Sequence, residues 1–410
     1  MNRLLQWSLL SACGAGIYVS WIQNEVVWYG FAAIIFLLGL IWATWQLSKP
    51  EDFRVPPVLL PLTGTLLWGG VQLLFGWSIY AFATQTELLR WGVYAALLLL
   101  SYRLFNTPAL EETFTHICVW YSFLLTLVSL VQFYSGSHRI FWLFLEVTDP
   151  KFGPFLNRDH YATFMILVIP MALYDGVRAT VRVSPLVISG LLYASVIASQ
   201  SRAGSVLATS EVFIFFLLLR LKGRAFGREM RLASIVLFAT STTLILVVGW
   251  EPLIKRFSPE SDLYRNERKK FIATSWQMLQ ARPVTGFGLG TWTLAYPQFA
   301  TYDNGKFVNA AHCDWAQWAD DGGLPMLGLM ICCFGFTLLF AVRVPWTLGL
   351  AAVMVHCLVE FPLQRPFLGA IYFCCLGVAA AACRDPLQRR AGAPSGRLFA
   401  APRSSNQEIE

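Results

Sequence analysis

The feature that most constrains this chain is its series of long apolar segments, separated by short polar connections. An α-helix needs roughly 18 or more mainly apolar residues to cross about 30 Å of hydrocarbon. VVWYGFAAIIFLLGLIWATW (26–45) meets that requirement, and CVWYSFLLTLVSLVQFY (118–134) is similarly apolar. Because lipid offers no hydrogen-bond partners, the backbone of each segment must satisfy itself as a helix. We therefore expect an all-α integral membrane protein.

The number of such segments predicts a helical bundle with about twelve transmembrane helices. Of the 410 residues, 56% are hydrophobic and 13% are charged, whereas a soluble domain has about 25% charged residues. The expected spans are roughly 4–22, 26–47, 57–76, 86–105, 114–134, 160–178, 184–200, 203–221, 232–250, 322–342, 345–362 and 366–383. The gap in this series, residues 251–321, predicts a large and partly helical loop.

Basic residues in the short connections orient the expected helices. Connections of one side contain Arg3, Lys49, Arg54, Arg103, Arg178, Arg182, the cluster RLKGRAFGREMR (220–231), Arg343 and the tail 384–397. The alternate connections, such as IQNE (22–25) and YAFATQTE (80–87), contain no Lys or Arg. The positive-inside rule places the basic side, and with it both termini, in the cytoplasm. The same topology accounts for the net charge of +7, so no nucleic-acid partner is expected.

The cysteines and the two ends of the chain add three expectations. None of the nine cysteines forms a CxxC pair, and most lie in apolar segments, which favours buried thiols over a metal site. The apolar text continues past Cys13 to Trp21, which favours an uncleaved first helix over a lipoprotein signal. The Arg-, Pro-, Ser- and Ala-rich residues 384–410 predict a disordered cytoplasmic tail.

Two long connections on the outer side, 133–162 and 251–321, contain cations against the topological bias. These are Arg139, Lys151, Arg158, Lys255, Arg256, Arg265, Arg268, Lys269, Lys270, Arg282 and Lys306. Their placement indicates an anionic ligand on the outer side. The alternative is that each is solvated or binds anionic headgroups.

The second connection contains a helical pattern followed by a glycine-rich turn. In NERKKFIATSWQMLQARP (266–283), one face is formed by Phe271, Ile272, Ser275, Trp276 and Leu279, with Arg268 one turn earlier. We expect this helix at the membrane surface, with Arg268 directed toward the headgroups. In GFGLG (286–290) the glycines allow this backbone to approach another group closely. No strand precedes this turn, so it does not indicate a dinucleotide site.

Two isolated residues in polar segments are further candidates. Arg202 lies in the short turn SQSRAG (199–204) between apolar segments, where an arginine is costly unless it faces a polar cavity or a partner. The alternative is that its side chain snorkels to the interface. His312 lies in the aromatic segment AAHCDWAQW (310–318), where a purely structural hydrogen bond is the alternative role.

Five segments together resemble the O-antigen ligase and polymerase superfamily, which are multi-pass membrane glycosyltransferases. They are FGPFLNRDHYATFMILVIPMAL (152–173), SQSRAG (199–204), RKKFIATSWQMLQARPVTGFGLGTWTLAYPQF (268–299), AAHCDWAQWADDGGLPMLGL (310–329) and VHCLVEFPLQRP (355–366). Their order and spacing match the superfamily over about residues 150–370.

The resemblance implies an architecture and a reaction. It implies a GT-C-like bacterial inner-membrane enzyme with N-terminal transmembrane helices at 1–150, a catalytic region at 151–383 and the tail at 384–410. The active site would face the periplasm and transfer a glycan from a polyprenyl-diphosphate carrier to an acceptor hydroxyl, with neither a metal nor another cofactor. Implied partners are the glycan donor, a glycan or lipid-core acceptor, membrane lipids, and a chain-length regulator or flippase.

The resemblance also implies roles for particular residues. Arg202 and Arg268 correspond to the diphosphate-binding arginines, and His312 corresponds to the family's histidine. Here Cys313 replaces the asparagine that usually follows that histidine. Cations stabilise the charge that develops on a leaving diphosphate, and a histidine can remove the acceptor's proton.

Further residues complete the expected site. Asp314 or Asp320 is expected to orient or assist His312, and Arg158 and Lys151 are further substrate-binding cations. Trp292, Tyr296, Trp315 and Trp318 are candidate stacking surfaces for sugars, with membrane anchoring as the alternative.

Three functions remain open from the sequence. A ligase would move a finished glycan onto an acceptor, and a polymerase would join lipid-linked repeat units for O-antigen or exopolysaccharide. A flippase for the lipid-linked glycan would not be an enzyme. Such transporters tend to contain charged or broken helices at the membrane midplane, whereas here the polar residues concentrate in outer connections.

Overall fold

The computed structural model describes residues 1–48, 54–178, 182–223, 227–248, 263–301, 305 and 307–384. The regular structure of these residues consists of helices and two isolated β-bridges. The helices are α1 (Asn2–Tyr18), α2 (Glu25–Leu47), α3 (Leu59–Leu74), α4 (Ala81–Leu104), α5 (Pro108–Tyr134), α6 (Arg158–Val177), α7 (Val183–Ala198), α8 (Arg202–Leu221), α9 (Arg228–Val248), α11 (Leu263–Ala281), α12 (Trp292–Ala295), α13 (Asp314–Arg343), α14 (Leu348–His356) and α15 (Pro366–Ala382). The expected tail beyond Arg384 and the cations Lys255, Arg256 and Lys306 lie outside the described residues.

Each of the twelve expected apolar segments coincides with a helix, which confirms the all-α fold class. Only α2, α5, α6, α8 and α13, among the described residues, are long and apolar enough to cross a membrane by length and composition. Others, such as α3, α7 and α15, are apolar but shorter. The count of twelve crossings is therefore not confirmed, whereas the helical character of the segments is.

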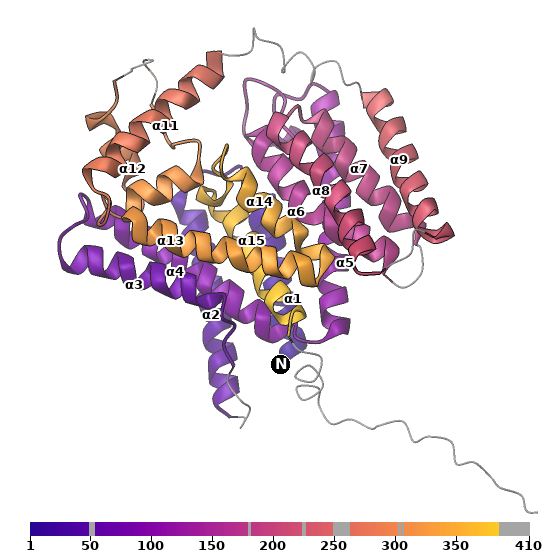
Figure 1. Ribbon diagram of the computed structural model, residues 1–410, viewed down its shortest axis with the longest axis horizontal. Coiled ribbons are helices and arrows are strands. Elements are labelled where there is room, and N and C mark those ends of the chain that lie inside the picture. Colours follow the sequence, from indigo (N-terminus) through magenta and orange to yellow (C-terminus); the bar gives the residue numbers. More distant parts are fainter. Residues whose placement is uncertain are drawn as a thin grey trace, which may run out of the picture.

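The bundle is built around α6, which packs against α5, α7, α8 and α14, while α15 packs mainly against α4. Figure 1 shows α6, α14 and α15 between α3 and α4 on one side and α7, α8 and α9 on the other. The α6 helix is apolar around its whole circumference, and such a helix is stable only when other elements surround it. Its start is fixed by Asn157, whose side chain accepts a hydrogen bond from the Asp159 amide.

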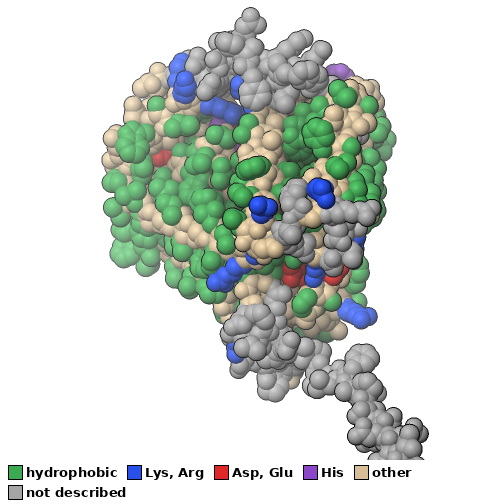
Figure 2. Space-filling view, turned by 45° about the vertical axis from the view of Figure 1, so that its right-hand side comes forward, with side chains coloured by type: hydrophobic (Ala, Val, Ile, Leu, Met, Phe, Trp, Pro, Cys, Tyr) green, Lys and Arg blue, Asp and Glu red, His purple; other side chains and the backbone are tan. Residues whose placement is uncertain are grey.

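The outer surface of the bundle is apolar. On the face drawn in Figure 2, hydrophobic side chains form extended areas with few charged groups among them. Leu40 on α2, Val131 on α5 and Phe213 on α8 are each at least 59% exposed. Exposed apolar surface of this extent is typical of a protein whose bundle is surrounded by lipid.

The glycine-rich turn approaches another group closely, as predicted, and that group is the backbone of α13. The amides of Phe287 and Gly288 donate to the carbonyls of Asp320 and Asp321, both at 2.9 Å. At this point α13 is kinked at Gly323, whose φ is +67°. A Cβ on Gly323 would lie 2.2 Å from the Val284 carbonyl oxygen, so the contact requires glycine.

Only part of the expected apolar face of α11 packs on the protein, and its position at the membrane surface stays a prediction. Its buried side chains are Phe271, Thr274, Ser275 and Met278, whereas Ile272 and Trp276 are 44% and 60% exposed. The helix packs its inner face on the segment that precedes α13, and Figure 1 shows α11 and α12 together at one end of the bundle. Arg268 lies one turn before Phe271, and its guanidinium contacts the protein groups Glu360 and Val359.

Candidate functional site

The first turns of α6 and α8 meet through a direct hydrogen bond. The Ser201 hydroxyl donates to the Asp159 carboxylate at 2.5 Å, and it also accepts from the Gly204 amide at 3.1 Å as the N-cap of α8. A Cβ on Gly204 would lie 2.5 Å from the Ala162 Cβ, so the glycine permits the close approach of the two helices. Arg202 follows Ser201 as the first residue of α8, which brings its backbone next to the Asp159 carboxylate.

Arg268 reaches the same carboxylate from α11. Its guanidinium pairs with Glu360, lies 3.8 Å from Asp159, and donates to the Val359 carbonyl at 3.2 Å. The Glu360 side chain is 1% exposed, and its second oxygen has no hydrogen-bond partner in the described structure. Burial and the negative charge of Asp159 raise the pKa of Glu360 well above its usual value, while Arg268 opposes this. The arginine therefore has acidic partners before any ligand is bound.

His312 lies between two aromatic rings beside this ion pair. Its ring stacks on Phe271 at 5.7 Å between centroids with 18° between planes, and it meets the edge of Phe361 at 4.8 Å. The backbone of His312 has a φ of +55°, an uncommon conformation for a residue other than glycine. Its Nδ1 is buried without a hydrogen-bond partner in the described structure.

The surroundings keep the His312 imidazole neutral. Burial, followed by the positive charges of Arg268 and Arg365, lowers the pKa of His312 to about 4. A neutral imidazole can accept a proton near neutral pH. The free Nδ1 and the neutral ring together suit a group that accepts a proton from a bound hydroxyl.

Phe361 is the centre of a larger group of polar side chains that the sequence interpretation did not assign to the site. His160 meets the edge of its ring at 5.3 Å, and the Arg365 guanidinium lies over it at 4.9 Å. His160 Nε2, His356 Nε2 and Arg365 Nε are buried without hydrogen-bond partners in the described structure. Burial and the charge of Arg90 lower the pKa of Arg365. Glu360 and Arg365 in the mainly apolar segment VHCLVEFPLQRP (355–366) were the sequence signal for this group.

Asp314 holds the segment that contains Glu360 and Phe361. It is 0% exposed, its amide donates to the Cys357 and Glu360 carbonyls, and its carboxylate accepts from the Leu363 amide at 3.0 Å. These contacts tie the start of α13 to the end of α14. Asp314 thus makes no described contact with the His312 ring, but it holds the segment that contains Phe361, against which that ring packs. Asp320 lies further along α13 and accepts from the Trp292 indole.

The predicted sugar-stacking aromatics occupy packed positions. Trp292 is 0% exposed, its indole donates to Ser275 and Asp320, and its ring stacks on Tyr296 at 4.6 Å. Tyr296 is 5% exposed and packs on Phe271. The Trp315 indole donates to the Met354 carbonyl at 2.9 Å. Trp292 and Tyr296 have no exposed ring face for a sugar. Tyr296 packs on Phe271, and Phe271 in turn stacks on His312.

The two remaining predicted cations lie in different places. Arg158 begins α6 beside Asp159 and donates to Gln200 at 3.2 Å, so it belongs to the meeting point of α6 and α8. Lys151 lies 4.0 Å from the Asp149 carboxylate in the connection before α6. In the described part of the chain, no contact connects Lys151 with Arg268 or His312.

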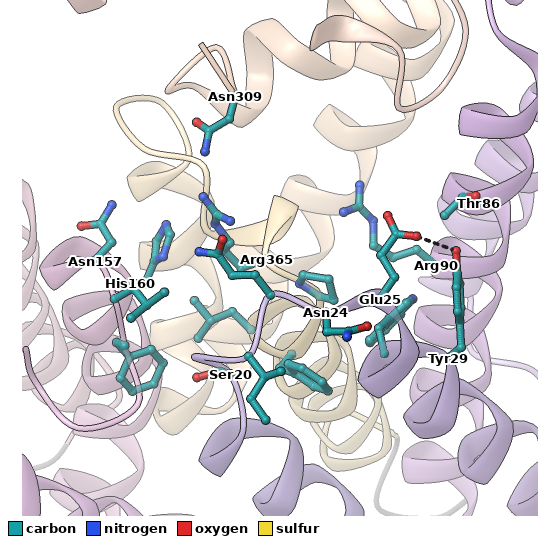
Figure 3. Close-up of a pocket in the computed structure, with 18 of the residues that line it drawn as sticks. Ser20, Asn24, Glu25, Tyr29, Thr86, Arg90, Asn157, His160, Asn309 and Arg365 are labelled. Atoms are coloured by element: carbon teal, nitrogen blue, oxygen red, sulfur yellow. Dashed lines mark hydrogen bonds between the residues drawn. The ribbon is translucent and has the colours of Figure 1, made fainter. Parts of the chain in front are cut away.

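A cavity of about 650 Å³ adjoins the Phe361 group through His160 and Arg365, which both line it. The rest of its wall comes from the α1–α2 connection, the start of α4, the residues before α6, and residues 307–309 before α13. Figure 3 shows Asn309 on one side of this space and Ser20 on the opposite side, with His160 and Arg90 toward its two ends. The volume is within the roughly 300–1,000 Å³ typical of small-molecule sites.

The one group with metal-ligand spacing in the described residues lies elsewhere, and it consists of Glu112, His116 and Asp175. Arg178 lies 3.2 Å from Glu112, and Arg182 lies 3.2 Å from Asp175. His116 lies 2.7 Å from Asp175. The two arginines already neutralise the carboxylates, so the arrangement is that of an ion-pair network.

Comparison with known proteins agrees with the resemblance seen in the sequence. Residues 187–331 match the family described as O-Antigen ligase. The matched region runs from α7 through α11 and the glycine-rich turn into α13, and so it contains Arg202, Arg268 and His312. No curated protein matches the chain.

Proposed function

Since the chain is a member of the O-antigen ligase and polymerase superfamily, we propose that it transfers a glycan from a polyprenyl-diphosphate carrier to an acceptor hydroxyl. The observation that carries the proposal is the convergence of α11 and the segment before α13, which brings Arg268 and His312 into contact with one short segment, Val359–Phe361. A cation and a neutral imidazole in that relation suit diphosphate departure and proton removal. We propose that this site faces the periplasm.

The leaving group is the diphosphate, and the arginines stabilise it. As the bond between the anomeric carbon and the diphosphate oxygen breaks, that oxygen keeps the electron pair, and nearby guanidinium groups stabilise its charge. Arg268 exchanges Glu360 for the diphosphate, and the raised pKa of Glu360 favours its neutral form when the arginine leaves it. Arg202 approaches the same place from the first turn of α8, and Arg158 from the first turn of α6.

The acceptor hydroxyl forms the new bond to the anomeric carbon, and its proton passes to a ring nitrogen of His312. The bound diphosphate offsets the positive charges of Arg268 and Arg365, which are among the causes of the low pKa of His312. Donor binding therefore makes the imidazole a stronger base when the acceptor is present. Asp314 acts as a positioning residue through its hold on Leu363.

We propose the ligase reaction, in which a finished glycan is moved to a lipid core or similar acceptor, with the polymerase reaction as the second candidate. The test is made in the native host, with the deletion complemented by the intact chain or by His312→Ala. The polyprenyl-diphosphate-linked glycans are extracted and their chain lengths determined. Long polymers retained on the lipid indicate a ligase, and single repeat units indicate a polymerase.

His138→Ala is the matched control, because His138 is an exposed histidine of the connection after α5. It is expected to restore the wild-type distribution of lipid-linked glycans. A lipid-linked pool that is the same in the deletion strain, the His312→Ala strain and the wild type contradicts both enzymatic reactions. It leaves the flippase to be tested by measuring the glycan on each leaflet.

A further inference from the structure

We propose that the 650 Å³ cavity beside His160 and Arg365 is a saccharide subsite, which binds an uncharged sugar unit of one of the two substrates. This inference rests on the proposed glycosyl transfer and adds where a sugar is held. The cavity opens from the Phe361 group away from the Arg268 pair, because its lining includes His160 and Arg365 but neither Arg268 nor Glu360. Sugar and diphosphate would thus occupy different sides of the same segment.

The charges in the cavity wall are balanced, which argues against a second diphosphate site. Arg90 pairs with Glu87 and also donates to the Gln364 carbonyl and side chain at 3.0 and 2.9 Å. The Glu25 carboxylate accepts from the Tyr29 hydroxyl at 3.1 Å, as Figure 3 shows. The cavity wall therefore contains two carboxylates for its two guanidinium groups. A strongly anionic ligand would meet two carboxylates in this wall, and one of them, Glu87, already pairs with Arg90.

The remaining polar groups suit hydroxyl and amide partners. Gln23 and Asn309 line the cavity from different segments, and neither side chain makes a hydrogen bond within the described part of the chain. An amide offers both donors and acceptors, and a sugar hydroxyl needs both. Trp28, Phe155 and Phe307 add apolar surface to the same wall, so that the carbon–hydrogen face of a sugar ring can be covered.

All of the wall comes from helix ends and connections at one end of the bundle. The α1–α2 connection and the start of α4 correspond to the two connections without Lys or Arg, 22–25 and 80–87. Residues before α6, before α13 and before α15 complete it. By the charge pattern these connections lie on the outer side, where a lipid-linked glycan and its acceptor meet. The α1–α2 connection, α2 and α4 thereby contribute to substrate binding, although the family match begins only at residue 187.

The test measures saccharide binding by the purified full-length chain in detergent, using titration calorimetry. One probe is the glycan released by mild acid from the host's own polyprenyl-diphosphate pool, and the other is the delipidated acceptor glycan from the deletion strain. Binding of the first assigns the cavity to the donor sugar, and binding of the second assigns it to the acceptor. Either result supports the subsite if substitutions in the cavity wall weaken the binding of that saccharide.

The variants are Gln23→Ala with Asn309→Ala, and Thr86→Phe, which inserts a ring into the cavity. Loss of each amide is expected to raise Kd about three- to tenfold, and Thr86→Phe is expected to raise it further. Gln298→Ala, at an exposed position outside the cavity, is the matched control and should bind as the wild type. Elution volume and thermal midpoint establish that each variant is folded, and the amide variants suffice if Thr86→Phe does not fold.

The inference is overturned if neither probe binds the wild type, or if the amide variants bind as tightly as Gln298→Ala. Failure of the proposed function is distinguished by a separate result, the lipid-linked glycan pool of the His312→Ala strain. An altered pool together with unaffected saccharide binding removes only the subsite and leaves the glycosyl transfer standing.

Discussion

The two ends of α6 each contain a cluster of ionisable side chains, and the clusters differ in how well their groups are paired. Asp159 and His160 belong to the cluster at its start, and Asp175 to the cluster near its end, about 24 Å further along the helix axis at 1.5 Å per residue. In the second cluster Glu112, His116 and Asp175 are paired with one another or with Arg178 and Arg182.

The cluster at the start of α6 is more buried and less satisfied. His160 Nε2, His312 Nδ1, His356 Nε2 and Glu360 Oε2 are all buried without hydrogen-bond partners in the described structure. An unpaired buried polar group costs about 1–3 kcal/mol, so several together require compensation elsewhere or a ligand that pairs with them. The contrast supports the proposal that the unsatisfied cluster binds the substrate, while the paired cluster connects helix ends through ion pairs.

The largest expected effect is on the rate of glycosyl transfer, and it distinguishes a histidine of the unsatisfied cluster from a histidine of the paired cluster. His312→Ala should lower the rate of glycosyl transfer about 10²- to 10⁴-fold, because it removes the proton acceptor. His116→Ala, in the paired cluster, should leave the rate within a few fold of wild type. The measurement is transfer of extracted lipid-linked glycan to acceptor by the two purified variants. Equal losses in both variants would remove the distinction between the clusters.

The next largest effect is expected for Arg268, the arginine that contacts Asp159 in the cluster at the start of α6. Arg268→Ala should lower the rate about 10²- to 10³-fold, since a charge-stabilising donor at the leaving group is lost. Arg268→Lys should recover only part of this loss, because an ammonium group cannot form the paired hydrogen bonds of a guanidinium group. Steady-state kinetics with varied donor concentration would measure it. A wild-type rate for Arg268→Ala would refute the role of this residue.

The pH dependence of transfer sharpens the comparison further. Neutral His312 is the active form, and its pKa is lowered to about 4 by burial and by the charges of Arg268 and Arg365. The value of kcat/KM should therefore stay constant from pH 8 down to about 5, and fall as the pH drops through about 4. Arg365→Gln removes one cause of the low pKa, so its acid limb should move upward. An acid limb near 6.5 in the wild type would contradict a buried neutral imidazole.

The smallest expected effect is in the paired cluster. Arg182→Ala removes contacts of 3.2 Å to Asp175 and 3.8 Å to Glu112, on a side chain that is 49% exposed. Exposed pairs contribute about 0–1 kcal/mol, so the free energy of unfolding should fall by no more than this. Thermal unfolding in detergent at low and high salt would test it. A loss of several kcal/mol would mean that this network is as critical as the buried one.

Much of the fold followed from local sequence pattern. The apolar segments coincide with α1 to α9 and α13 to α15, because lipid and a dry protein interior impose the same demand for backbone self-pairing. GFGLG was correctly interpreted as a site of close backbone approach. The family match covers Arg202, Arg268 and His312, the residues selected from the sequence. These features depend on spacing along the chain, which a single sequence contains.

The environment of the site depended on contacts between distant segments. Arg268 pairs with Glu360, 92 residues away, a partner that its helix pattern did not predict. Trp292 became a buried support because Ser275 and Asp320 accept its indole N–H. His160, Arg365 and His312 come together only around Phe361. By itself, the sequence determined which segments are helices and which residues carry charge, because periodicity and composition are local properties. The tertiary structure decided which face of each helix is buried and which charges meet, because these depend on packing energies between segments that no local pattern contains.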